Sequence, residues 1–116
     1  NYKYMLWRQN MEPLTGYPSD VFPRLIRRVN SIVNDWSVRE FYIGRTVDPS
    51  KRKTEHDSDD IIPVYLTESI KHAIGIENSL IDYFYEHSKC NNDAPHGGGG
   101  VSEEYGNYVY VAVWTY

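Results

Sequence analysis

A short stretch in the first half of the chain combines residue types that can handle a phosphate group. The tripeptide Tyr-Ile-Gly at 42–44 ends a segment typical of a strand, and Arg52 and His56 follow it on one face of a predicted helix. An arginine fork matches phosphate oxygens, and an imidazole can hold or relay a proton near neutral pH. Taken alone, however, the basic residues around Lys51 are most simply a solvated turn.

A second chemical feature is a carboxylate that helical periodicity turns inward. Apolar residues recur at helical spacing in the segment that follows Thr67, and Glu77 falls in the middle of that stripe. An ionised carboxylate on a buried face needs an arginine, a set of hydrogen bonds or a metal ion to compensate for lost hydration. Two explanations of Glu77 are equally open from the sequence. The residue either belongs to a buried Glu–Arg pair that only stabilises the fold, or it belongs to a functional site.

Together these residues resemble the GIY-YIG nuclease family. The tripeptide at 42–44 copies that family's second tripeptide, and Arg52 follows its glycine by eight residues, with His56 four residues further on, as in the family. The pattern Glu77-x-x-Leu-Ile matches the family's metal-binding glutamate. The family commonly has an asparagine shortly afterwards, and Asn92 lies in that range. The resemblance covers less than half of the chain.

The first tripeptide of the family is missing from its expected place. The window 32–37 is the end of a helical stripe, whereas the C-terminal segment 106–111 resembles a Gly-Ile-Tyr strand with Asn in the middle. We therefore hypothesise a circularly permuted GIY-YIG fold, in which Tyr108 takes the place of the missing tyrosine. An added strand with an incomplete site is the alternative, and a strand at Tyr2–Trp7 is a weaker candidate for the missing member.

The resemblance implies a metal-dependent endonuclease that hydrolyses DNA phosphodiester bonds. Tyr108 or Tyr42 would act as or assist the general base, and His56 would assist proton transfer or position the base. Arg52 would neutralise charge on the phosphate, and Glu77 would hold one Mg²⁺ or Mn²⁺ ion per site. The alternative function is a non-catalytic nucleic-acid or protein interaction module on a degenerate GIY-YIG scaffold.

Four further residues are expected to bind the DNA substrate. They are Gly44, Arg45, Lys51 and Asn92. A domain of this size would often need a partner chain to cut both strands, so a homodimer is one expected assembly.

Composition sets the limits on this interpretation. The 116 residues, 41% of them hydrophobic, suit one small domain, and the net charge of -4 argues mildly against a general nucleic-acid coating protein. Local basic patches remain compatible with that balance. The single Cys90 excludes an internal disulfide framework, and no apolar stretch reaches the length of a membrane helix. We expect an intracellular protein, cytoplasmic or nuclear, without membrane partners.

The pattern along the chain predicts an α+β fold with a small antiparallel or mixed three-stranded sheet flanked by helices. Residues 1–39 would be an N-terminal extension with a helix, 40–92 the motif-bearing core and 105–116 a strand that completes the sheet. The expected elements are helices from Asp20 to about Trp36, from Pro49 to near His56 and from Thr67 to about Ser88, and strands at 40–46, 61–66 and 105–116. Pro63 indicates an edge strand or a bulge, whereas two apolar faces make 105–116 an interior strand.

Overall fold

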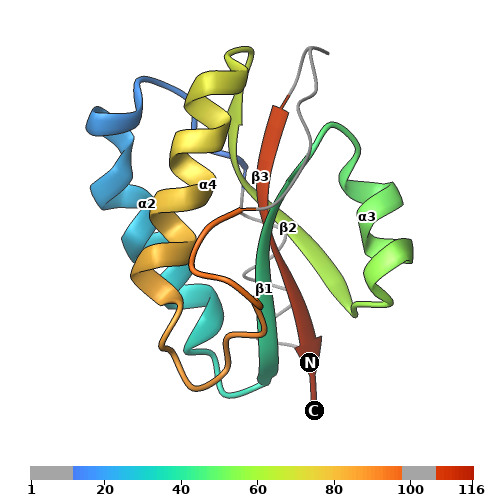
Figure 1. Cartoon of the computed structure of the whole chain (residues 1–116). Coiled ribbons are helices and arrows are strands. Elements are labelled where there is room, and N and C mark those ends of the chain that lie inside the picture. Colours follow the sequence, from blue (N-terminus) through green and yellow to red (C-terminus); the bar gives the residue numbers. More distant parts are fainter. Residues whose placement is uncertain (1–11, 98–106) are drawn as a thin grey trace.

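A three-stranded antiparallel sheet and three helices form the part of the chain that the computed structural model describes, residues 12–97 and 107–116 (Figure 1). The predicted α+β class is confirmed, and the sheet is antiparallel rather than mixed. The elements in chain order are α2 (Pro18–Val33), β1 (Val38–Thr46), α3 (Pro49–His56), β2 (Asp60–Thr67), α4 (Ile70–Phe84) and β3 (Asn107–Thr115).

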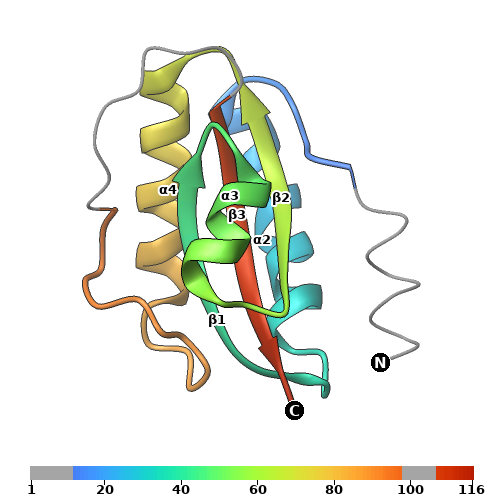
Figure 2. The ribbon, with the colours of Figure 1, turned by 90° about the vertical axis from the view of Figure 1, so that its right-hand side faces the viewer.

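The last strand of the chain is the centre of the sheet. β3 lies between β1 and β2 and is antiparallel to both, so the prediction of an interior strand is confirmed. Its Val109, Val111 and Val113 point into the main core beneath α2 and α4. Its opposite face carries Tyr110 and Ala112 and is covered by α3, which lies across the sheet in Figure 2. Two-sided burial explains the continuous apolar sequence of β3.

The two long helices contribute one apolar stripe each to the main core. The fully buried members are Val21, Leu25, Val29, Ile32 and Val33 on α2, and Ala73, Ile76, Leu80, Ile81 and Phe84 on α4. The expectation that α2 continues to Trp36 is wrong. The helix ends at Val33, and Trp36 lies in the following turn with 67% of its surface exposed.

Short segments cover both edges of the sheet. β2 is an edge strand with a register shift after Pro63, as that residue predicted. Leu14 pairs with its outer side through backbone hydrogen bonds of 2.8 and 2.9 Å. On the other edge, Phe41 of β1 exchanges backbone hydrogen bonds with the segment 89–91. Unpaired strand edges invite association with other chains, and these two segments remove that exposure along part of each edge.

Several sequence-based expectations fall outside the described residues. They concern the strand at Tyr2–Trp7, Gly106 and most of the glycine-rich loop that precedes it. Among the helices that are described, none is both long and apolar enough to cross a membrane.

Asn92 extends the cover of the β1 edge with its side chain, and this leads to a stability prediction. Its Oδ1 accepts from the Ile43 N–H at 3.0 Å and its Nδ2 donates to the Ile43 carbonyl at 2.9 Å. Asn92→Ala leaves both backbone groups without these partners and should lower the free energy of unfolding by about 1–3 kcal/mol in urea titrations. Asn91→Ala, at an exposed neighbouring side chain, is the control. Equal midpoints for the two variants would contradict this role.

Candidate active site on the α3 face of the sheet

The short helix α3 carries two of the predicted catalytic residues and is fixed at both ends. Asp48 caps its first turn by accepting from the Lys51 N–H at 3.2 Å, and Pro49 takes the first helical position. At the other end, Trp114 of β3 donates its indole N–H to the Asp57 carbonyl at 3.1 Å. None of the eight residues of α3 is fully buried. The two end contacts therefore hold Arg52 and His56 over the sheet.

Four aromatic side chains meet between α3 and the sheet. His56 Nε2 lies 2.8 Å from the hydroxyl of Tyr110, and the ring centroids of His56 and Tyr42 are 4.8 Å apart. Trp114 meets the imidazole edge-on at 6.4 Å. Tyr110 is only 2% exposed, whereas Tyr42 and His56 are partly exposed. Tyr42, His56 and the partly exposed Trp114 are consequently the members of the cluster that a substrate can touch.

Gly44 makes the position of Tyr110 possible. The two residues are opposite one another in the pairing of β1 with β3. A Cβ atom on residue 44 would lie 2.6 Å from Tyr110 Cζ, nearer still to its hydroxyl oxygen, and 3.0 Å from Tyr42 Cε1. The substrate-binding role of Gly44 stays a prediction. Its observed role is to leave room for the Tyr110 hydroxyl.

Sequence reasoning missed Tyr110 and chose Tyr108 instead. The pairing register sets Tyr108, two residues before Tyr110 on β3, opposite Thr46, while Tyr110 is the residue that reaches His56. Both tyrosines lie on the same face of the strand, so alternation could not separate them. The glycine at position 44 was the available signal, because a bulky ring on the neighbouring strand needs an opposite residue without a side chain.

Arg52 places a positive charge beside the aromatic cluster. Its side chain is 42% exposed and pairs with Glu55 at 2.8 Å. Exposed pairs of this kind contribute little stability, so they do not prevent the guanidinium from meeting a phosphate. The charge also reaches the cluster, because it helps to lower the pKa of His56 and opposes the rise in the pKa values of Tyr42 and Tyr110.

Burial decides the protonation states in the cluster. It raises the pKa values of Tyr42 and Tyr110 from their usual 10.0, and the negative charge of Glu77 adds to both rises. It also lowers the pKa of His56 from its usual 6.5, with the Arg52 charge as the second cause. Near neutral pH both tyrosines are therefore protonated and His56 is neutral.

Glu77 faces inward as its position in the helical stripe predicted. It is 5% exposed, and its Oε1 lies 3.5 Å from Nε of Arg45, with both side chains almost completely buried. Burial raises the pKa of Glu77, and the Arg45 charge opposes that rise. Of the compensating groups that the sequence left open, an arginine is the one observed. Arg45 therefore pairs with the carboxylate here, although the sequence had suggested substrate binding.

Glu77 is the candidate ligand for a divalent ion. Within residues 12–97 and 107–116, no group of three or more His, Cys, Asp or Glu side chains gathers as a ready-made metal cage. Glu77 offers one buried carboxylate, and Mg²⁺ accepts one or two carboxylates completed by waters. The donor type fits such an ion, but Arg45 already lies beside it.

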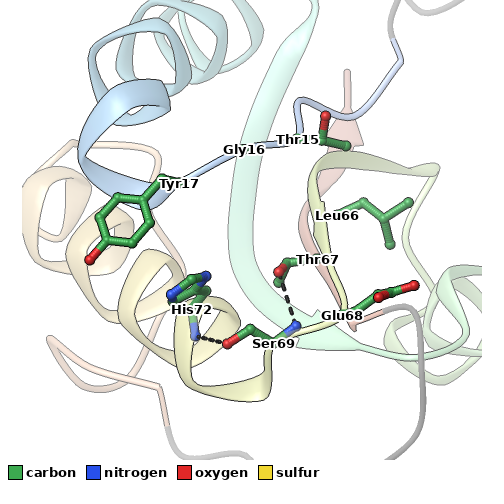
Figure 3. Close-up of a pocket in the computed structure, with 8 residues that line it drawn as sticks. All are labelled: Thr15, Gly16, Tyr17, Leu66, Thr67, Glu68, Ser69 and His72. Atoms are coloured by element: carbon green, nitrogen blue, oxygen red, sulfur yellow. Dashed lines mark hydrogen bonds between the residues drawn. The ribbon is translucent and has the colours of Figure 1, made fainter.

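One pocket adjoins the predicted site residues, and a larger one is lined by other residues. One of about 200 Å³ opens beside Tyr42 and is lined by Tyr42, Asn92, Asp93, Ala94, His96 and Gly97. A larger one, about 770 Å³, lies between the start of α2, the end of β2 and the start of α4 (Figure 3). None of the predicted site residues lines the larger pocket. Lys51, also predicted to bind substrate, is exposed on α3.

Comparison with known proteins adds no relative. No protein-family model matches the chain, and searches of curated proteins and of solved structures returned no match. The functional argument therefore depends on the geometry of the chain itself.

The contact between Gly44 and Tyr110 gives a mutational prediction. Gly44→Ala should push the Tyr110 hydroxyl away from His56 and cost about 1–3 kcal/mol of stability through overpacking. Gly75→Ala is the matched control, because a Cβ there meets nothing within 4 Å and α4 should gain about 0.5–1 kcal/mol. Urea unfolding measures the stabilities, and the His56 side-chain NMR resonances report the contact. Unchanged His56 resonances in Gly44→Ala would refute the packing argument.

The electrostatics give a second prediction. The His56 imidazole should titrate below pH 6.5, because burial and the Arg52 charge both disfavour its protonated form. Arg52→Gln should raise this pKa, whereas Arg24→Gln on α2, behind the sheet, should not (Figure 1). Since the unfolded chain binds the proton more tightly, the folded state should lose stability as pH falls from 6.5 through the folded pKa. NMR titration of the His56 ring protons measures this pKa, and a value above 6.5 would contradict the prediction.

Proposed function

We propose that this chain is a metal-dependent endonuclease that hydrolyses DNA phosphodiester bonds on the α3 face of its sheet. The observation that carries the proposal is the meeting of Tyr42, His56 and Tyr110 under the influence of two opposite charges, Arg52 and Glu77. A phosphodiester hydrolase needs a proton acceptor for water, donors for the phosphate oxygens and a balancing positive charge. The cluster offers each of these groups.

His56 is the proposed general base. Its lowered pKa keeps the ring unprotonated near neutral pH, which is the form that can accept a proton. If Nε2 carries the ring hydrogen and donates it to the Tyr110 oxygen, Nδ1 is left as the acceptor. The attacking water would give its proton to Nδ1 as its oxygen bonds to phosphorus and the bond to the leaving oxygen breaks. Tyr110, which is buried, acts here as a positioning residue.

Tyr42 and Arg52 are the proposed contacts to the phosphate. The raised pKa of Tyr42 keeps its hydroxyl protonated, so it can donate a hydrogen bond to a phosphate oxygen. Arg52 adds a fork of donors and a permanent charge from the neighbouring helix. Glu77 would hold the divalent ion, Mg²⁺ or Mn²⁺, and the ion would supply charge stabilisation at the phosphate.

The topology supports a GIY-YIG-like fold in permuted order. In that family the strand of the first tripeptide pairs in a hairpin with the strand of the second. Here β3 pairs antiparallel with β1, which carries the tripeptide at 42–44. In this proposal Tyr110, rather than Tyr108, fills the position of the first tyrosine. An intracellular setting would give the enzyme access to DNA, and a homodimer would provide a second site for the second strand.

One observation favours a second function, a non-catalytic interaction module on a degenerate scaffold. The Arg45–Glu77 pair supplies a positive charge beside the buried carboxylate without any metal ion. A chain that had lost catalysis could keep such a pair for folding alone.

A plasmid assay separates the two functions. Supercoiled DNA incubated with the protein and Mg²⁺ or Mn²⁺ should become nicked, and His56→Ala should reduce the rate by about 10²- to 10⁴-fold, as expected for loss of a general base. Arg52→Ala and Glu77→Gln should also abolish nicking. Arg24→Ala, on the opposite side of the sheet, should leave it unchanged.

The outcomes are distinct. Nicking that persists in all three site variants would reject the assignment of the site. DNA binding by gel shift without any cleavage would favour the interaction module. Linear product that appears only at protein concentrations giving a dimer in light scattering would support two cooperating sites.

A further inference from the structure

We propose that Arg45 is a resident cation on Glu77 and that a divalent ion binds this carboxylate only by displacing it. The inference rests on the proposed function for one point, the identity of Glu77 as the metal ligand. It adds a chain-specific control of metal entry, since position 45 directly follows the tripeptide that ends in Gly44.

Arg45 and a divalent ion would compete for one negative charge. Nε of Arg45 and Oε1 of Glu77 are 3.5 Å apart, and their side chains are 5% and 6% exposed. A guanidinium stays charged at every pH at which the protein folds. A divalent ion bound to the same carboxylate would lie close to that fixed charge in a site with little water to screen it. The two cations therefore exclude one another unless Arg45 moves.

The space around the Glu77 carboxylate is also limited. Gly97 lies against both carboxylate oxygens of Glu77, because a Cβ on residue 97 would be 2.5 Å from Glu77 Cδ, 2.9 Å from Oε2 and nearest of all to Oε1, the oxygen that faces Arg45. Its N–H donates to Asn78 Oδ1 at 2.7 Å, which anchors the segment on α4. Arg45 and the backbone at Gly97 therefore both lie close to Oε1, and an ion that bound this oxygen would need the space that the guanidinium occupies.

Glu77 also lies close to the aromatic cluster through its neighbour Gly97. The pocket of about 200 Å³ beside Tyr42 is bounded by Gly97, the same residue that contacts Glu77. The charge of Glu77 is also felt at Tyr42 and Tyr110. An ion that replaced Arg45 would consequently act at the edge of β1 next to Tyr42.

Metal affinity, measured without DNA, tests the proposal. Mn²⁺ titration of the full chain by electron paramagnetic resonance should give weak binding to the unmodified protein. Arg45→Met keeps much of the buried stem and removes the charge, so it should tighten Mn²⁺ binding by about tenfold, within the range of coupling between groups in contact. Arg24→Met is the control and should change nothing. Adding Glu77→Gln to Arg45→Met should remove the gained affinity.

Arg45→Lys keeps the charge, so this variant should bind Mn²⁺ about as weakly as the unmodified chain. It is the control for structural changes that any substitution at position 45 could cause. Mn²⁺ should also raise the melting temperature of Arg45→Met more than that of Arg45→Lys. Equal Mn²⁺ affinity of these two variants and the unmodified chain would overturn the proposal, as would a gain that survives Glu77→Gln. Tighter Mn²⁺ binding without plasmid nicking would keep this inference and reject the nuclease.

Discussion

The register of β3 against β1 is the constraint on which the site depends. It sets Tyr110 opposite Gly44, and it sends the valines of β3 into the core beneath α2 and α4. A shift by one residue would exchange the two faces, burying tyrosine hydroxyls in the main core and leaving valines beneath α3. The packing of the core therefore fixes the place of Tyr110. The hydrogen bond between Tyr110 and His56 follows from that packing and not from local sequence.

This dependence explains what sequence could and could not predict. Local rules were sufficient for α3, where Asp48 and Pro49 begin the helix, and for the inward position of Glu77 on α4. Two-sided apolar alternation was sufficient to make β3 interior. The choice of Tyr110 over Tyr108 needed the register of strands far apart in the sequence. The pairing of Glu77 with Arg45 likewise needed the angle at which α4 crosses β1.

The buried Arg45–Glu77 pair also bears on why these two residues are present. Desolvation of two charges consumes much of their mutual attraction, and a well-packed apolar pair is often as stable or more so. The stability of the fold therefore does not require two charged side chains at this place in the core. The charge of Glu77 nevertheless reaches Tyr42 and Tyr110. The proposed function would give this pair a role that the stability of the fold does not require.

The charge distribution bears on the choice between the two proposed functions, an enzyme and a binding module. Affinity for DNA grows with the number of phosphates that a protein neutralises, and the chain as a whole carries a net charge of -4. On α3, the helix over the aromatic cluster, the cations are Lys51, Arg52 and Lys53, and Glu55 pairs with Arg52 on the same helix. If the proposed function is right, so small a basic surface would hold DNA briefly and with a strong dependence on salt. Brief contact suits turnover, whereas a module whose function is to remain bound would need a wider basic face.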